Sequence, residues 1–347
     1  MTAPGKTKMT QRRIAELAGV SQATVSLVLN GKADSDARIP EATRQRVLDV
    51  IAGTSYVADP AARRLAGVGN KILGVFTYEP AFPSGSIDFY TPLLTGIEAE
   101  AEQHGCDLLV FTSAPVESGR RRLFHENNRL GLADGALLLG REMDPVELER
   151  LVDMQFPFVA IGRRDVPGVP YVGVDYAAGT AELVRRAVAL GHRRLALLHL
   201  DSTAESVLDR QRGFREEVAA HADIRVWSGP TRGDDLVGAW TRIRDFRPTV
   251  LFVESPDHAA ELRRIAIDDG VEIPREVSIV VLGEVAVHDA LAVDFTRLSP
   301  PRVQLGADAV ALLTRILDPD DEPTDADLRR LLDCDITDGS TLVAVVE

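Results

Sequence analysis

Short apolar runs alternate with segments of helical periodicity from Lys71 to the end of the chain, and no other feature restricts the fold as strongly. The runs read ILGVFTY, DLLVFT, GALLLG, PFVAIG, YVGVD, RLALLHL, TVLFVE and VSIVVLG. Runs that are apolar throughout are typical of strands buried on both faces of a parallel sheet. Strands that alternate with helices, expected for example over about 91–104 and 118–130, predict doubly wound α/β layers.

Length decides how many such layers the chain forms. Of the 347 residues, roughly 280 belong to the alternating part, which is more than one layer set holds. We therefore predict a two-lobed α/β core of doubly wound parallel sheets over residues 71–347. A cleft between the lobes is where ligands of such folds bind.

The stretch 10–30, TQRRIAELAGVSQATVSLVLN, has the layout of two short helices joined by a tight turn. Thr10 and Ser21 are suitable N-caps, and Gly19 supplies the positive φ that ends the first helix. Apolar residues recur three and four apart, and small residues at the crossing allow close approach. This spacing predicts a helix-turn-helix, although a helical hairpin without any DNA-binding role has the same periodicity.

Pro40 is placed to open a third helix, through about Ala52, whose apolar face can cover the first two helices. The short segment AARRLAG then follows Pro60. One or two helical turns are unstable alone in water, so this segment is expected to be ordered only when it is bound. The predicted domains are a small all-α helix-turn-helix head over 1–57, a hinge helix and linker over 58–70, and the core over 71–347.

Charge is unevenly distributed along the chain. Residues 1–67 carry ten Lys and Arg against six Asp and Glu, a net charge of +4, whereas the whole chain carries −14. A basic head on an acidic body is typical of a protein that contacts nucleic acid at one end only. Cys106 and Cys334 show no spacing of a disulfide framework or metal site, which favours two reduced core thiols. Without a signal-peptide core or a run of about 18 apolar residues, we expect a cytoplasmic protein that does not enter a membrane.

Enzymatic motifs are missing from the sequence. It contains no G-x-S-x-G, H-E-x-x-H, P-loop or complete G-x-G-x-x-G after a strand. The seven histidines are scattered, and His192, after Gly191 at a helix end, is interpreted as structural. The sequence therefore predicts no catalytic residues, no metal and no cofactor.

Several motifs, in this order, resemble the LacI/GalR family of bacterial transcriptional repressors. They are IAELAGVSQATVSLVLNG, TRQRV, SYVADPAARRLAG, GVDYAAGTAELVRRAVALGHRRLALL, RQRGF and VSIVVLG. The resemblance covers essentially the whole chain. It implies a dimer or tetramer whose headpiece reads the major groove and whose hinge helix enters the minor groove. It also implies a periplasmic-binding-protein-like core that takes a small effector, often a sugar.

The resemblance places base-reading residues at Gln22, Ala23 and Leu27. A glutamine amide can pair with adenine N6 and N7, and an alanine can pack on a thymine methyl group. Many family members have arginine in place of Leu27, so this side chain either alters readout at that base or packs on sugar or a neighbouring helix. Phosphate-contacting or capping roles are expected for Ser21, Thr24 and Ser26.

The hinge segment matches the family as well. Leu65 corresponds to the leucine that wedges between central base pairs, and without the family it would be an ordinary linker leucine. Arg63 and Arg64 stand where minor-groove or phosphate contacts are made.

The effector residues implied by the resemblance lie in loops that follow strands. An aromatic ring there can stack on a sugar face and a carboxylate can take paired hydroxyls, although core packing explains Phe89 equally well. Arg210 matches a family arginine, with a surface salt bridge as the alternative. The family's Asn-Asp pair is replaced by 254–257, and its usual aspartate falls on Gly283. The predicted effector residues are Tyr78, Asp88, Phe89, Tyr90, Arg163, Asp175, Arg210, Asp257 and Glu284.

The sequence thus predicts a sequence-specific transcriptional regulator, a repressor, with double-stranded operator DNA and a small effector as its partners. The effector class implied is a carbohydrate, and the assembly is a homodimer or tetramer. Two alternatives stay open, namely a cytoplasmic solute-binding protein and an architectural DNA-binding protein without effector control.

Overall fold

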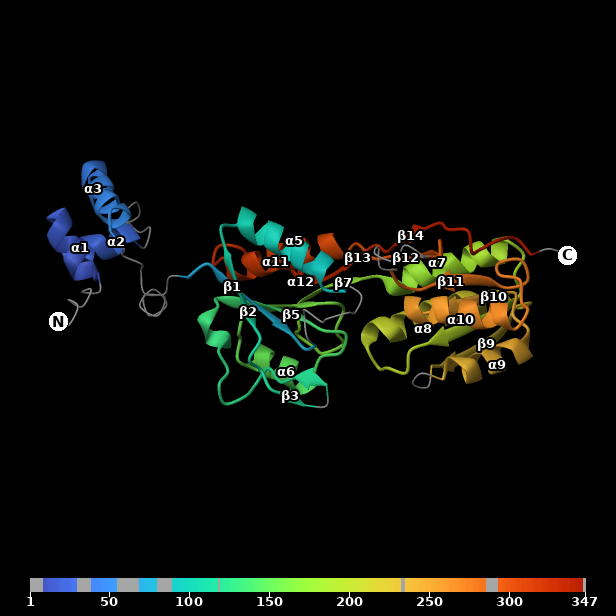
Figure 1. Cartoon of the computed structure of the whole chain (residues 1–347). Coiled ribbons are helices and arrows are strands. Elements are labelled where there is room, and N and C mark those ends of the chain that lie inside the picture. Colours follow the sequence, from blue (N-terminus) through green and yellow to red (C-terminus); the bar gives the residue numbers. More distant parts are fainter. Residues whose placement is uncertain are drawn as a thin grey trace, which may run out of the picture. The chain divides into compact units, whose positions relative to one another are not determined.

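A computed structural model describes residues 9–29, 39–54, 69–79, 89–117, 119–231, 235–284 and 293–345. The chain forms two compact units, Met1–Lys71 and Ile72–Glu347 (Figure 1). The first unit is the helical head and the second is the α/β core. None of the helices in these described ranges has the length and apolar character needed to cross a membrane.

The head consists of α1 (Gln11–Ala18), α2 (Gln22–Leu29) and α3 (Glu41–Ala52). The Thr10 side chain accepts a hydrogen bond from the backbone N–H of Arg13 at the start of α1, and Gly19 ends this helix with φ 65°. Ser21 Oγ accepts from the backbone N–H of Thr24 at 3.1 Å. The predicted helix-turn-helix layout and its caps are therefore confirmed.

One small core holds the three helices of the head together. Its buried members come from all three helices, and they are Ile14, Ala15, Ala18, Val25, Val28 and Val47. Leu17 of α1 and Leu48 of α3 are apolar but do not belong to this core, because they are 48% and 37% exposed. Short helices that meet in a trio bury only a narrow stripe each, and both leucines lie outside that stripe.

Two sheets of six strands organise the second unit, and they define lobe 1 and lobe 2. In lobe 1 the strand order is β13-β7-β6-β5-β1-β2, and every neighbouring pair is parallel. Its elements are β1 (Ile72–Thr77), α5 (Thr91–Gln103), β2 (Asp107–Phe111), β5 (Gly135–Leu139), α6 (Pro145–Asp153), β6 (Phe158–Ile161), β7 (Tyr171–Val174), α11 (Arg302–Leu317), α12 (Asp325–Leu328) and β13 (Arg329–Leu332).

Lobe 2 repeats this arrangement with the strand order β14-β12-β11-β10-β8-β9, in which only the β12–β14 pair is antiparallel. Its elements are α7 (Tyr176–Ala189), β8 (Arg194–His199), α8 (Glu205–Ala219), β9 (Arg225–Pro230), α9 (Leu236–Phe246), β10 (Val250–Val253), α10 (Pro256–Asp268), β11 (Ser278–Val281), β12 (Thr296–Ser299) and β14 (Asp335–Thr337).

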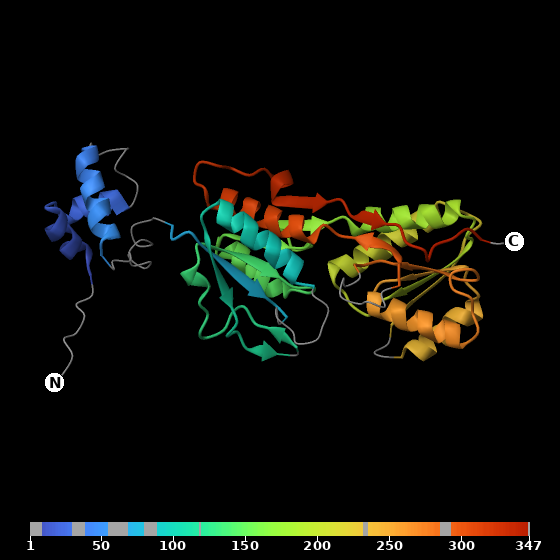
Figure 2. The ribbon, with the colours of Figure 1, turned by 45° about the horizontal axis from the view of Figure 1, so that its top comes forward.

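Helices cover both faces of each sheet, as Figures 1 and 2 show. In lobe 1, α5 and α11 lie side by side over one face and α6 lies over the other. In lobe 2, α7 and α8 cover one face, while α9 and α10 cover the other. Alternate strand residues enter different cores, since Leu195 and Leu197 face α7 whereas Ala196 and Leu198 face α10. This two-sided burial explains why the strands are apolar throughout, and it confirms the predicted doubly wound fold.

The chain passes between the lobes three times within the described residues, after β7, after β12 and after β13. Consequently α7 begins lobe 2 directly after the last central strand of lobe 1, and α11 returns to lobe 1. Each lobe is therefore built from separate stretches of sequence.

The prediction of a helix over 118–130 was wrong. This stretch holds a small hairpin of β3 (Val116–Glu117) and β4 (Arg120–Arg121), followed by irregular backbone and a 3₁₀ turn, η1 (Leu130–Leu132). Gly119 has a φ of 81°, which favours a hairpin turn over a helix. Leu123 and Leu130 of this stretch are nevertheless buried against the lobe 1 sheet.

Candidate DNA-reading face and effector site

The exposed side of α2 is the candidate DNA-reading face. Val25 and Val28 point into the head core, whereas Gln22 and Ala23 are exposed. Leu27 is half-buried and is not a member of that core. The three base-reading candidates therefore lie away from the buried stripe of α2, as an element that enters a groove requires.

The polar residues around α2 serve the helix itself. Ser21 Oγ lies 2.9 Å from Thr24 Oγ1, in addition to capping the helix. Ser21 is exposed, and Thr24 and Ser26 are half-buried. Their proposed contacts with phosphate stay a prediction. The hinge candidates Arg63, Arg64 and Leu65, and the effector candidate Asp88, lie outside the described residues.

Two aromatic residues predicted for the effector site, Tyr78 and Tyr90, are buried inside lobe 1 and make contacts there. Tyr78 is 1% exposed and packs edge-on to Phe76 at 5.1 Å, in the core beneath α6. Burial, together with the neighbouring Glu147 carboxylate, raises the pKa of the Tyr78 phenol. Tyr90 is buried too, and its hydroxyl donates to the Glu79 carboxylate. Placing Tyr78 in an effector cleft was therefore wrong, because the β-strand register turns its side chain into the core.

Phe89 keeps part of its surface accessible. Its ring is edge-on to Tyr90 at 5.1 Å between centroids, and the Arg302 guanidinium carbon lies 4.9 Å from the Phe89 ring centroid. The expected stacking surface therefore carries an arginine in this structure.

Arg163 and its neighbour Arg164, both just after β6 of lobe 1, bind carboxylates of α8 in lobe 2. Arg163 Nε donates to Asp209 Oδ2 at 2.7 Å, and Arg164 Nη1 donates to Glu205 Oε2 at 2.9 Å. Glu205 and Asp209 are four residues apart, so both carboxylates lie on one side of α8. Arg163 thus bridges the lobes, and its guanidinium is already paired where an effector was expected.

Arg164, which the sequence did not single out, is the more buried of the two arginines. Its side chain is 4% exposed, and it also donates to the carbonyl oxygens of Gly140 at 2.7 Å and Ile161 at 3.3 Å. Desolvation lowers the pKa of this guanidinium, and the Glu205 carboxylate opposes that effect. A fully buried arginine needs such a set of acceptors, because an unpaired charge in a protein interior is very costly.

Arg210 lies inside α8 and not at the end of a strand, so its predicted placement was wrong. Its Nε donates to the carbonyl oxygen of Leu282 at 2.6 Å, and its guanidinium carbon lies 3.6 Å from the Tyr176 ring centroid. Nη1 lies 3.6 Å from Glu254 Oε1. Burial raises the pKa of Glu254, and the Arg210 charge opposes that shift. The arginine is 9% exposed, which also removes the surface salt bridge as an explanation.

The remaining predicted carboxylates have structural partners or face away. Asp175 is the N-cap of α7, where its side chain accepts from the backbone N–H of Ala178 at 2.9 Å. Glu284 accepts from Arg297 Nε at 3.0 Å. Asp257 is exposed in the first turn of α10, which Ser255 caps. Their predicted roles toward an effector stay untested.

Side chains from both lobes meet where the chain passes between them, and we call this set the lobe junction. Lobe 2 supplies Tyr176, Arg210 and Glu284, and lobe 1 supplies Phe89 and Arg302. The sequence reasoning missed Tyr176 and Arg302. The signal available was their position, since Tyr176 follows YVGVD directly and Arg302 follows the Pro-Pro pair at a helix start.

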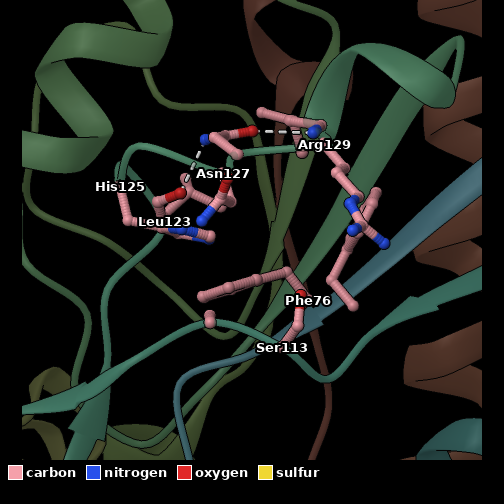
Figure 3. A pocket seen from close by; sticks show the side chains of 10 residues that line it. Phe76, Ser113, Leu123, His125, Asn127 and Arg129 are labelled. Carbon is pink, nitrogen blue, oxygen red and sulfur yellow. Dashed lines mark hydrogen bonds between the residues drawn. The ribbon is translucent and has the colours of Figure 1, made fainter.

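Two hollows lie elsewhere in the core. Figure 3 shows a cavity in lobe 1 where Phe76, Ser113, Leu123, His125, Asn127 and Arg129 converge. Its volume of about 20 Å³ suits a single water molecule. A groove of about 500 Å³ runs between α7 and α8, lined by small and charged side chains such as Ala181 and Glu216. The cavity lies where the expected 118–130 helix is replaced by irregular backbone.

His192 has a structural role, as predicted. It is 2% exposed, and its two ring nitrogens lie 3.0 Å from Thr249 Oγ1 and 2.9 Å from the Val343 carbonyl oxygen. Burial lowers the pKa of this imidazole. Across the described part of the chain, His, Cys, Asp and Glu side chains form no cluster suited to a metal ion.

Two family models match the chain. One, described as bacterial regulatory proteins of the lacI family, matches residues 11–59, which include the whole helix-turn-helix. The other, described as a periplasmic binding protein-like domain, matches residues 184–342.

Related proteins are similar along most of their length. The HTH-type transcriptional regulator CelR of Thermobifida fusca is 28% identical over 319 residues, which cover 88% of this chain and 90% of that protein. Catabolite control protein A of Priestia megaterium is 26% identical over 313 residues, which cover 88% of this chain and 91% of that protein.

Solved structures share the fold. A complex of the transcriptional regulator CelR with cellobiose is 26% identical, has a TM-score of 0.63 and covers 96% of this chain and 100% of that chain. A lac repressor dimer bound to operator and the anti-inducer ONPF is 20% identical, has a TM-score of 0.73 and covers 97% of this chain and 100% of that chain.

A helix-turn-helix head followed in one chain by a two-lobed, periplasmic-binding-protein-like core defines a class of DNA-binding transcriptional regulators. The head matches the lacI-family model, the core matches the periplasmic binding protein-like model, and the relatives that are similar over most of the chain are transcriptional regulators, so the chain has the domain organisation of lacI-family regulators. The resemblance seen in the sequence is thereby confirmed.

Proposed function

We propose that this protein is a repressor that binds operator DNA through α2 and changes its operator affinity when a small effector binds between the lobes. The observation that carries the proposal is the exposure of Gln22 and Ala23 on a packed helix-turn-helix whose chain continues into the two-lobed core. A head of this kind supplies sequence readout, and a core of this kind supplies a ligand-sensitive hinge.

In this proposal each DNA contact has a distinct role. Gln22 reads adenine, Ala23 packs on a thymine methyl group, and Leu27 contributes an apolar surface at a third position. Ser21, Thr24 and Ser26 fix the register of α2 on the phosphates. Residues 58–70 act as the hinge, in which Arg63, Arg64 and Leu65 contact the minor groove of the central base pairs.

The effector proposal follows from the lobe junction and from the relatives. The related CelR has been solved with cellobiose, and we extend a carbohydrate effector to this chain. Arg163–Asp209 and Arg164–Glu205 tie the lobes together in the described structure. An effector that binds better to one lobe arrangement shifts the population toward it and so alters the spacing of the two heads in a homodimer.

Location and assembly complete the proposal. The protein acts in the cytoplasm, without catalytic activity, as a homodimer or tetramer on a pseudo-palindromic operator. The two-fold symmetry of the dimer is what a pseudo-palindrome would mirror.

The test is binding-site selection from random double-stranded DNA with the full-length protein. We expect an enriched inverted repeat, whose affinity falls by roughly two to four powers of ten between low and moderate salt as about five to eight phosphates are neutralised. Binding without sequence enrichment would support the architectural alternative, and no DNA binding would support a solute-binding protein. Both outcomes would contradict the proposal.

The hinge is tested with the selected operator. Leu65→Ala should weaken binding to the operator far more than binding to unrelated DNA, since only a bent specific complex uses a wedge. Equal losses on both DNAs would argue against intercalation.

A further inference from the structure

Arg302 begins α11 at the lobe junction, and no carboxylate in the described ranges forms an ion pair with its guanidinium. Its Nε atom is buried without any hydrogen-bond partner, and among the described residues none accepts a hydrogen bond from its guanidinium. The group instead lies against the Phe89 ring, 4.9 Å from the centroid. A buried donor left unpaired costs free energy unless something else supplies an acceptor.

A second guanidinium, that of Arg210, lies on the same side of the junction, because it stacks on Tyr176, and Tyr176 packs against the same lobe 1 core as Phe89. Burial lowers the pKa of Arg302 most strongly, and the charge of Arg210 lowers it further, while Tyr176 and Glu284 act in the opposite direction. Arg210 itself stacks on Tyr176 at 3.6 Å. The two arginines come from α8 and α11, so the two lobes each contribute one.

The carboxylates nearby are already engaged. Glu284 binds Arg297 Nε at 3.0 Å, and Glu254 lies 3.6 Å from Arg210 while it accepts from the backbone N–H of Leu200 at 2.9 Å. The guanidinium groups of Arg210, Arg297 and Arg302 therefore outnumber the two carboxylates, Glu254 and Glu284, that pair with them in the described residues at and beside the junction. The excess positive charge is held in place by ring stacking and by backbone carbonyl oxygens, neither of which neutralises it.

We propose that the effector of this protein carries an acidic group, a carboxylate or a phosphate, and that Arg302 and Arg210 bind that group between the lobes. The inference rests on the proposed effector control and specifies its ligand as a sugar acid or sugar phosphate. An oxyanion supplies the acceptors that Arg302 lacks, and guanidinium groups bind such anions through paired, charge-assisted hydrogen bonds. Because each lobe provides one arginine, the anion also draws the lobes together.

The experiment is a thermal-shift and calorimetric titration of the full-length protein at constant ionic strength. The acidic probes are D-glucuronate, D-glucose 6-phosphate and inorganic phosphate, and the neutral probes are D-glucose and cellobiose. Arg302→Met removes the charge at similar length, and Arg302→Lys keeps a charge. Arg315→Met is the matched control, because Arg315 lies at the other end of the same helix and pairs with Asp321 and Asp327.

We expect at least one acidic probe to raise the melting temperature of the wild type, since a ligand that binds only the native state stabilises it. Arg302→Met should bind that probe about ten- to a hundredfold more weakly, the loss typical of a charge-assisted hydrogen bond. Arg302→Lys should retain part of the affinity, and Arg315→Met should match the wild type. Preference for glucuronate or for glucose 6-phosphate separates a carboxylate ligand from a phosphate ligand.

Two results would overturn the acidic effector. One is the absence of stabilisation by any acidic probe, and the other is equal stabilisation of the wild type and Arg302→Met. A neutral probe that alters operator affinity equally in both proteins would leave the repressor function intact and remove only this inference. Operator binding itself, measured without any probe, tells whether the proposed function has failed separately.

Discussion

Replacing Arg164 by methionine should weaken the core severely, because the variant removes one member of a buried ion pair and leaves its partner in place. The Arg164 side chain is 4% exposed and that of Glu205 is 18% exposed. The substitution leaves the Glu205 carboxylate and the carbonyl oxygens of Gly140 and Ile161 without their guanidinium donor.

The size of the effect follows from these contacts. Breaking a buried pair by removing one partner costs about 3–5 kcal/mol. Glu205 keeps some access to water, so we expect the lower end, about 3 kcal/mol, in the free energy of unfolding. Removing both partners, with Arg164→Met and Glu205→Leu together, should cost less than Arg164→Met alone, since no uncompensated carboxylate remains.

Urea denaturation measures this prediction well. Both tryptophans, Trp227 in β9 and Trp240 in α9, report on lobe 2, and far-ultraviolet circular dichroism reports on the whole core. Arg264→Met is the control, because Arg264 pairs with Glu261 and Asp268 on an exposed side of α10, and its unfolding midpoint should stay at the wild-type value. An Arg164→Met midpoint as high as that of the control would refute the reasoning.

Three further predictions use other parts of the chain. Gln22→Ala should cost about 1–3 kcal/mol on the cognate operator and broaden the selected base at one position per half-site; an unchanged profile would exclude Gln22 from readout. Gly213→Ala would bring a Cβ to 2.1 Å from the Ala177 carbonyl oxygen, so α7 and α8 should be forced apart at a cost of roughly 1–3 kcal/mol, visible as a lower melting temperature. Burial lowers the pKa of His192 below its ordinary 6.5, so the unfolded chain binds a proton there before the native state does, and stability should fall as pH drops below about 6.5. Urea midpoints between pH 5 and 8 should show a flatter profile for His192→Gln, and an identical profile would contradict this assignment.

The strands of both lobes could be predicted because a strand that is buried on both faces is a continuous apolar run in the sequence. Leu195–Leu198 alternate between two cores, and each must be apolar whichever way it points. The helix caps of the head could be predicted as well, since Thr10 and Ser21 accept hydrogen bonds from backbone N–H groups only three residues away. Such features depend on near neighbours in sequence, so one chain is enough to predict them.

The junction was harder to predict because its partners are far apart in the chain. Nothing near Arg302 in sequence shows that its guanidinium lies against the Phe89 ring, and nothing near Arg210 shows that it stacks on Tyr176. Arg210 was assigned to a strand end, but it lies inside a helix, where the phase of the helix decides what its side chain meets. The prediction that Tyr78 lines the effector site was wrong for a similar reason. A shift of one position along the chain decides whether a side chain points into the core or lies in the loop.

Because the chain passes between the lobes several times, the order of its segments also determines which lobe is completed first during synthesis on the ribosome. Five strands of lobe 1 have been synthesised by Val174, yet α11, which covers Leu137 and Val159 on one face of their sheet, is complete only at Leu317. At about 5–20 residues per second, that apolar face is covered by α5 alone for roughly seven to thirty seconds. Lobe 2 emerges in the meantime as a nearly continuous piece that still lacks β14 and the C-terminal residues after it, such as Thr341 and Val343, which bond to lobe 2. In the cell, lobe 2 can therefore fold first, while the unfinished sheet of lobe 1 is the part of the nascent chain most exposed to chaperones and to aggregation.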